Sequence, residues 1–137
     1  MNQTKITVET NIAADLHKTW LFYTSPEHIT KWNFADASWH CPSAGNDLKV
    51  GGLYSARMEA IDGSIGFDFD AVYTEVVPYK TFTYEFGGRH ATVTFLENNE
   101  TTFVTVSFDP ENENSLELQR AGWQAILNNF KTYTESH

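Results

Sequence analysis

The segment 115–133 has the apolar spacing of one long amphipathic helix. Its large side chains recur every three or four residues along one face, which consists of Leu116, Arg120, Trp123, Leu127 and Phe130, with Ile126 beside them. The polar residues of the segment, Gln119, Gln124, Asn128, Asn129 and Lys131, fall mainly on the other faces. Asn114, followed three residues on by Glu117, predicts the helix start. A helix of about five turns has to bury such a stripe against a large apolar partner.

Strands dominate residues 53–108, so a sheet is the only large partner that the chain offers to this helix. Alternating and apolar-rich runs predict strands over 53–60, 65–77, 81–86, 90–96 and 102–108. Turn sequences separate these runs, namely Gly51-Gly52, Asp62-Gly63, Gly87-Gly88 and Asn98-Asn99, and Pro78 stops the longest run. Strands joined in sequence by short turns pair antiparallel.

The N-terminal third adds one strand and two short helices. Alternation predicts a strand over 4–12, and apolar residues at helical spacing predict a helix over 14–23. Ser25 as a cap and Pro26 as the first helical residue predict a second helix that ends near Trp32. Residues 33–46 have no clear period and are predicted to be a loop. We therefore expect a single α+β domain, residues 1–137, whose curved antiparallel sheet wraps around the long C-terminal helix.

Charge and composition exclude several classes of partner. The chain has 9 Lys and Arg residues against 18 Asp and Glu residues, which gives a net charge of −9. Such a surface repels phosphate backbones and anionic lipid headgroups, so it argues against nucleic acid and against membrane association. The N-terminus lacks the pattern of a signal peptide, no run is long enough to span a membrane, and Cys41 is the only cysteine. These features predict a cytoplasmic protein without disulfides.

Several motifs follow one another at a specific spacing. They are VETNIAA at 8–14, Thr19-Trp20, TSPEH at 24–28 with Trp32 after it, VGGLY at 50–54, FDFDAVYTEVVP at 67–78 and GWQAIL at 122–127. In this order they resemble the START-like (SRPBCC) superfamily, and most of all its heat-shock-protein ATPase activator-like branch. Thr19 departs from the family pattern, which usually has a branched aliphatic residue before the Trp, and the segment 33–46 matches no family pattern.

This resemblance implies the helix-grip fold (START-like, Bet v-like), in which a sheet bends around the last helix and commonly leaves a cavity between them. Members of the superfamily bind lipids, sterols, hormones or polyketides. Some are cyclases or hydrolases, and one branch regulates the ATPase of a chaperone. The fold by itself does not decide among these functions.

The histidines and the cysteine do not form a catalytic or metal-binding motif. No two histidines stand three or four residues apart, and none has a cysteine at ligand spacing: the five are His17, His28, His40, His90 and His137. His40 and Cys41 are neighbours, but adjacent residues seldom orient correctly as base and nucleophile. We therefore expect no metal site, no cofactor and no catalytic residue.

Paired carboxylates are the remaining catalytic candidates. Asp68 and Asp70 stand two residues apart on a predicted strand, so they share one of its faces. The other face of that strand carries Phe67, Phe69, Ala71 and Tyr73, which is the better inward face. The two aspartates are thus predicted to face solvent rather than to form an acid–base pair.

Aromatic residues make up 15% of the chain, and rings of this size often line concave sites. Residues from seven predicted segments are candidates for a ligand-binding set: Trp32, Trp39, Met58, Phe69, Tyr73, Tyr84, Phe86, His90, Arg120, Trp123, Leu127 and Phe130. Arg120 is the most informative, because a cation buried without a partner is costly. It either meets an anionic group of a ligand or reaches a partner at the surface.

The leading hypothesis is a carrier or sensor that binds a hydrophobic small molecule, such as a lipid, a sterol or an aromatic, polyketide-like compound. The second is a chaperone-associated regulator, and the third is a polyketide cyclase-like or hydrolase-like enzyme that would use Tyr73, His90 and Arg120. An open space under the last helix would support binding, and a filled one would indicate a surface-interaction domain. A monomer and a homodimer are both compatible with the sequence.

Overall fold

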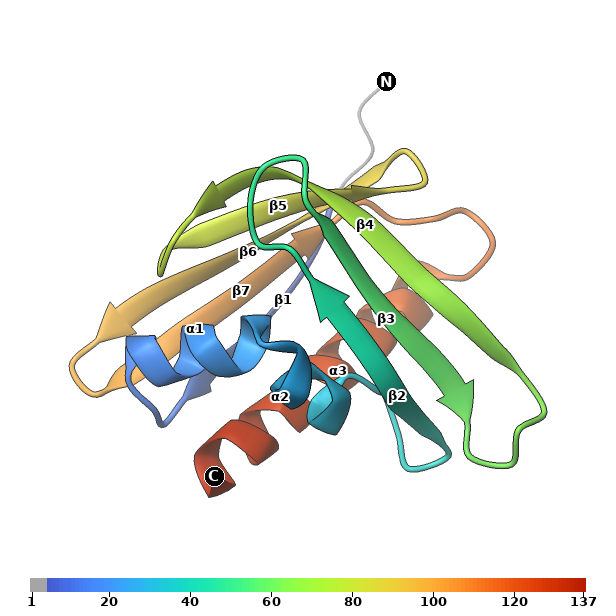
Figure 1. The fold of residues 1–137 in the computed structure, drawn as a ribbon, viewed down its shortest axis with the longest axis horizontal. Helices are drawn as coiled ribbons and strands as arrows, with labels where there is room; N and C mark the ends of the chain where they lie inside the picture. Colours follow the sequence, from blue (N-terminus) through green and yellow to red (C-terminus); the bar gives the residue numbers. More distant parts are fainter. Residues whose placement is uncertain (1–4) are drawn as a thin grey trace.

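The computed structural model describes residues 5–137, which form one seven-stranded sheet and three helices (Figure 1). The strands are β1 (Ile6–Ile12), β2 (Trp39–Asn46), β3 (Leu53–Ala60), β4 (Gly66–Val77), β5 (Thr81–Phe86), β6 (Arg89–Asn98) and β7 (Thr101–Phe108). The helices are α1 (Leu16–Thr24), α2 (Pro26–Trp32) and α3 (Leu116–Ser136). This is the α+β helix-grip arrangement that the sequence predicted, although Thr4, the first residue of the predicted first strand, lies outside the described residues.

All neighbouring strands pair antiparallel, in the order β1-β7-β6-β5-β4-β3-β2. Strands β2 to β7 follow chain order, and β1 returns to lie beside β7. Figure 1 shows the sheet curving over α3, which runs beneath it with α1 and α2 at one end. Helix α3 packs along β1 and against α1 and α2, whereas the β3–β4 part of the sheet stands away from it. The backbone of α3 is therefore close to the β1 edge of the sheet and farther from its β3–β4 half.

The sequence prediction for residues 33–46 was wrong in its second half, because residues 39–46 form strand β2. This strand pairs with β3 on one side only, and its register shifts between His40 and Ser43. Pro42 lies at the shift, where the missing N–H of a proline does no harm. A bulged edge strand has no strict alternation, which explains why periodicity did not reveal it.

Two helix caps differ from the prediction. Ser115, and not Asn114, is the N-cap of α3, because its hydroxyl accepts a hydrogen bond from Leu118 N at 3.1 Å. Ser25 precedes α2 as expected, but its side chain makes no capping hydrogen bond. Helix α1 is capped by Asp15, whose carboxylate accepts from Lys18 N at 2.8 Å. Ser115 and Asp15 thus each accept a hydrogen bond from a free N–H group of the first helical turn, whereas Ser25 only occupies the cap position.

The buried face of α3 is displaced from the predicted one. Its buried residues are Gln119, Leu127, Phe130 and Thr134, with Trp123 and Ile126 partly buried beside them. Leu116 is 52% exposed because it lies in the first turn, and Arg120 is exposed as well. Gln119, predicted to lie elsewhere, is only 8% exposed.

Arg120 belongs to a row of polar residues that covers the free edge of β1. Arg120 Nη1 donates to Thr7 O at 2.6 Å, Gln124 Nε2 to Glu9 O at 3.2 Å and Lys131 Nζ to Asn11 O at 2.6 Å. These carbonyls alternate along β1 and point away from β7. The prediction that Arg120 lies on the inner stripe was therefore wrong: it binds the carbonyl of an edge strand that would otherwise be open to pairing with another chain.

Candidate functional site

A cavity of about 400 Å³ lies between α3 and the β3–β5 part of the sheet. Helices α1 and α2 close one end of it, and the segment 109–115 lies at the other. Its lining is largely aromatic and aliphatic and consists of Tyr23, Trp32, Asn33, Tyr54, Met58, Phe67, Phe69, Tyr84, Phe86, Arg89, Val106, Glu111, Asn114, Gln119, Trp123, Ile126 and Leu127.

Strand alternation places the rings in this cavity. Tyr54 on β3, Phe69 on β4 and Tyr84 on β5 project from the inner face, and their ring centroids lie 5.4 to 6.0 Å apart. The three rings pack against one another edge-on or tilted, and all three also line the cavity. Trp123 of α3 stacks on Phe108 at 3.9 Å and forms the facing wall.

Seven of the residues selected from the sequence line this cavity: Trp32, Met58, Phe69, Tyr84, Phe86, Trp123 and Leu127. Trp39 and Phe130 are close to it but do not line it. Trp39 packs edge-on against Phe67 at 6.0 Å, and Phe130 is fully buried against Tyr23 and Trp32. Both residues support the wall from behind.

The other three selected residues, Tyr73, His90 and Arg120, do not meet. The Tyr73 hydroxyl donates to Asn46 Oδ1 at 2.8 Å inside the core. His90 lies on the outer face of β6, 3.6 Å from Asp109 and 4.0 Å from Glu85, because Ala91 and Val93 occupy the inward positions of that strand. Since Arg120 is at β1, the three residues considered for an enzyme are dispersed, and none of them lines the cavity.

The sequence reasoning missed ten lining residues. Tyr54 and Phe67 could have been found by strand alternation, since Tyr54 shares a strand face with the selected Met58 and Phe67 with the selected Phe69. Val106 lies on the buried face of β7, but no residue of that strand was selected. Tyr23 was assigned to the stripe of its helix but not to a cavity. Arg89, Glu111, Asn114 and Gln119 gave no signal, because they come together only through the path of the segment 109–115. The remaining two are Asn33 and Ile126.

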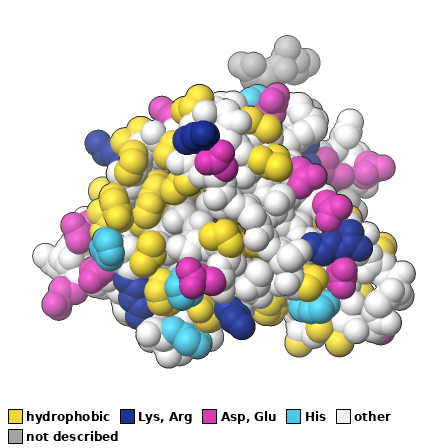
Figure 2. All heavy atoms as spheres, viewed as in Figure 1, with side chains coloured by type: hydrophobic (Ala, Val, Ile, Leu, Met, Phe, Trp, Pro, Cys, Tyr) yellow, Lys and Arg dark blue, Asp and Glu magenta, His cyan; other side chains and the backbone are white. Residues whose placement is uncertain are grey.

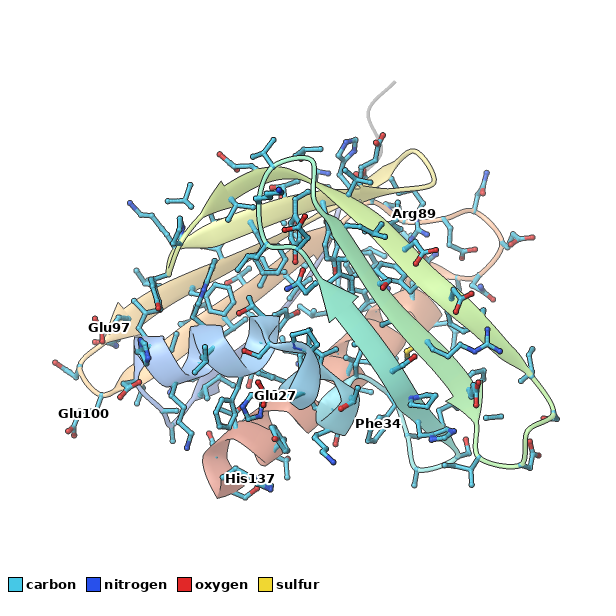
Figure 3. The ribbon with its side chains drawn as sticks, in the orientation of Figure 1. Glu27, Phe34, Arg89, Glu97, Glu100 and His137 are labelled. Atoms are coloured by element: carbon cyan, nitrogen blue, oxygen red, sulfur yellow. The ribbon has the colours of Figure 1, made fainter. Side chains whose placement is uncertain are left out.

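Polar residues form the cavity end next to the start of α3. Arg89 lies there, beside the loop that leads into α3 (Figure 3), with its guanidinium 4.8 Å from the centre of the Phe86 ring and its Nε donating to Asp109 O at 3.1 Å. The backbone N–H of Asn114 donates to the carboxylate of Glu111 and lowers the pKa of Glu111. This end therefore carries one cation and one anion.

Gln119 holds the segment 109–115 on α3. Its Oε1 accepts from Glu111 N, and its Nε2 donates to Glu111 O and Asn114 O, each at 2.9 Å. We expect Gln119→Leu to lower the free energy of unfolding by about 2–3 kcal/mol, because three backbone groups lose their partner. Gln124→Leu is the control, since Gln124 is more exposed and should cost under about 1 kcal/mol. Urea unfolding measures both, and equal losses would contradict the special role of Gln119.

Tyrosine hydroxyls gather at the opposite end, near α1 and α2. Burial raises the pKa of Tyr23, Tyr54, Tyr73 and Tyr84, and the charge that Tyr84 would carry raises the other three further. All four phenols therefore stay neutral at physiological pH. Asn33 Nδ2 donates to the Tyr54 hydroxyl at 3.5 Å.

Tyr73 has a structural role that separates it from the other three. Its hydroxyl donates to Asn46 Oδ1, and Asn46 Nδ2 donates to Thr24 O at 2.7 Å, so the pair links β4, β2 and the end of α1. Tyr73→Phe should lower the free energy of unfolding by about 1–2 kcal/mol, because it leaves the Asn46 oxygen without its donor. Thermal or urea unfolding will show this. Tyr84→Phe, which breaks no hydrogen bond within residues 5–137, should stay within about 0.5 kcal/mol of the unchanged protein.

The cysteine and carboxylate candidates do not form reactive pairs. Cys41 is 2% exposed, and burial raises the pKa of its thiol, which donates to Ser43 O at 3.4 Å. His40 pairs instead with Glu59 at 3.6 Å. Asp68 and Asp70 face solvent, as predicted, and Asp68 pairs with Arg57 at 3.4 Å. Within residues 5–137 no three His, Cys, Asp or Glu side chains are grouped as a metal site would require.

None of the helices in the described part of the chain has the length and apolar character needed to cross a membrane.

Comparisons with known proteins agree with this architecture. Residues 13–135 match the family model described as "Activator of Hsp90 ATPase homolog 1-like protein". No curated protein matches the chain. The solution structure of an AHSA1-like protein from Aeromonas hydrophila is 36% identical, covers 97% of this chain and 93% of its own, and has a TM-score of 0.91.

Two further solved structures are similar over nearly the whole chain. A protein from Cytophaga hutchinsonii is 47% identical, with coverage of 96% of this chain and 92% of that one and a TM-score of 0.83. A protein from Nitrosomonas europaea is only 16% identical, with coverage of 97% and 95%, yet its TM-score is also 0.83. The last comparison shows that the fold persists where little of the sequence does.

Proposed function

We propose that this chain, which belongs to the activator of Hsp90 ATPase homolog 1-like family, binds a hydrophobic small molecule in the cavity beneath α3 as a carrier or sensor. One observation carries the proposal: the space under α3 is open and not filled by side chains. A packed core would instead have favoured a surface-interaction domain.

The size and lining of the cavity support a small apolar ligand. Its volume of about 400 Å³ is within the range of ~300–1,000 Å³ that small-molecule sites usually have. Trp123 and Phe69 offer flat apolar faces, and desolvating them would stabilise a complex by roughly 25 cal/mol per Å² before ordering costs. Phe67 is 50% exposed and lines the cavity, so it marks the mouth through which a ligand would enter.

The proposal is tested by adding fatty acids, sterols and flavonoid-like aromatics to the protein and following its amide signals by NMR. Binding in the cavity predicts shifts for Trp123, Phe69 and their neighbours, with exposed residues such as Leu96 and Glu100 as internal references. Shifts confined to the outer surface would contradict it.

We also propose that the protein binds without transforming its ligand. The residues considered for an enzyme, Tyr73, His90 and Arg120, are engaged with Asn46, with Asp109 and Glu85, and with Thr7 respectively. Incubating the bound compound with the protein and analysing it by mass spectrometry should return it unchanged. A new product formed in proportion to protein concentration would overturn this part of the proposal.

The second candidate function, regulation of a heat-shock chaperone ATPase, is favoured by the family match. It requires an exposed binding surface, and Figure 2 shows apolar side chains gathered on one side of the molecule among acidic and basic ones. A pull-down and an ATPase assay with the chaperone of the same host distinguish the two functions. A protein that only binds a ligand in its cavity leaves the ATPase rate unchanged, whereas a regulator changes it.

A further inference from the structure

We propose that the α1–α2 end of the cavity binds a neutral hydrogen-bond-accepting oxygen of the ligand, such as a ketone carbonyl, through the hydroxyls of Tyr23, Tyr54 and Tyr84. This inference rests on the proposed function and narrows its ligand to apolar molecules that carry such an oxygen. These three hydroxyls form the phenol end of the cavity.

The phenol end is assembled from three separate elements. Tyr23 comes from α1, Tyr54 from β3 and Tyr84 from β5, and all three line the cavity. Tyr54 and Tyr84 are each only 7% exposed, with ring centroids 5.4 Å apart. Tyr23 is fixed from behind by Phe130 at 4.8 Å and by Trp32 at 4.9 Å. The rings therefore have little freedom to turn their hydroxyls elsewhere.

These hydroxyls have protons to donate. Within residues 5–137, the Tyr23 and Tyr84 hydroxyls have no hydrogen-bond partner, and the Tyr54 oxygen accepts from Asn33 while its own proton has no acceptor. Thr134 Oγ1 is the one side-chain atom of that range that is both sealed and unpartnered. The tyrosine hydroxyls differ from it because they border the open cavity. Because a phenol O–H is a hydrogen-bond donor, these hydroxyls can donate to water in the cavity or to an acceptor oxygen of a ligand that replaces that water.

The charges in the cavity select a neutral acceptor. Among the described lining residues Arg89 is the one cation, and it lies at the far end, where it contacts Phe86 and Asp109. Its guanidinium lies against the ring of Phe86 and its Nε already donates to Asp109 O, so within residues 5–137 no hydrogen bond joins it to a tyrosine hydroxyl. The Phe86 ring centroid is 5.9 Å from that of Tyr84. A carboxylate at the phenol end would be buried without a cation, which is costly. A carbonyl oxygen would use the free donors at no such cost.

The test compares three probes of similar shape by NMR titration of the full chain: benzophenone, diphenylmethane and diphenylacetate. Benzophenone should bind at least about 10-fold more tightly than diphenylmethane, in which a methylene replaces the carbonyl, and more tightly than the charged diphenylacetate. The ¹³C signal of the benzophenone carbonyl should move downfield on binding. These three measurements need no variant.

Tyrosine-to-phenylalanine variants then test which hydroxyls donate to the benzophenone carbonyl. Tyr84→Phe and Tyr54→Phe should each weaken benzophenone binding by roughly 2- to 10-fold and leave diphenylmethane binding unchanged. Tyr79→Phe is the matched control, because Tyr79 is 40% exposed and lies outside the cavity.

Different results would contradict the role of the phenol end and ligand binding in the cavity as a whole. Equal affinity for benzophenone and diphenylmethane, tightest binding of diphenylacetate, or unchanged benzophenone binding in the Phe variants would overturn the assignment of the phenol end while cavity binding stands. If no probe shifts residues of the cavity, and the fatty acids, sterols and aromatics do not either, cavity binding itself is refuted and the assignment with it.

Discussion

Phe130→Ala should lower the free energy of unfolding by about 3–5 kcal/mol, a large part of the ~5–15 kcal/mol that a domain usually has. Phe130 is fully buried and packs edge-on against both Tyr23 and Trp32, at 4.8 and 4.9 Å. Removing the ring leaves a void where α3, α1 and α2 meet. Urea unfolding followed by tryptophan fluorescence and by circular dichroism measures the loss.

Leu116→Ala is the matched control for this prediction. By sequence spacing Leu116 and Phe130 occupy the same stripe of the same helix, but Leu116 is 52% exposed. It should therefore change the free energy of unfolding by no more than about 0.5 kcal/mol. Losses of similar size at both positions would mean that the first turn of α3 is buried in solution, contrary to the structure.

The elements of the fold followed from local patterns. Alternation in β3 and β5 predicted both strands, because a strand with one buried face repeats every two residues. Asp62-Gly63 predicted the turn from β3 to β4, where the φ of Gly63 is +77°. The antiparallel pairing of the consecutive strands β3 to β7 followed as well, since strands joined by short turns pair with their neighbours in sequence. The position of β1 beside β7 was not predicted.

Strand β2 and the exposed side of α3 did not follow, and both failures have the same origin. Each lies at an edge of the sheet, where the environment is set by one neighbour and not by two. β2 is bulged around Pro42, and Arg120 binds a carbonyl of β1. Helical spacing predicts the direction of a side chain but not which element it faces. The role of Arg120 could therefore be seen only once the position of β1 beside α3 was known.

The candidate site was predictable where it is built from regular elements. Met58, Phe69 and Tyr84 were selected because strand alternation points them inward, and they line the cavity. The end of the cavity formed by Arg89 and Glu111 could not be predicted, because an irregular segment brings these residues together. The size of the space is also not encoded locally. It depends on how far the β3–β4 half of the sheet curves away from α3.

Blocking the cavity with indoles is the prediction that separates its role from that of the outer surface. The double variant Met58→Trp and Ile126→Trp places one ring from β3 and one from α3 into the space between them. It should weaken binding of benzophenone, or of whichever fatty acid, sterol or aromatic binds most tightly, by at least about 30-fold, or ~2 kcal/mol. Met58 is 8% exposed and Ile126 is only partly buried, so the open space beside them accepts the added volume with little strain.

The control for the blocked variant is Ile61→Trp with Ile65→Trp. Both isoleucines lie at the turn between β3 and β4, are 60% and 59% exposed and do not line the cavity. This pair adds the same indoles to the surface and should leave ligand affinity unchanged. If the blocked variant keeps its affinity, or if the control loses it to the same degree, the ligand binds outside the cavity. A chaperone effect that survives in the blocked variant and disappears in a surface variant would then place that second function on the outer face, because one cavity cannot account for both results.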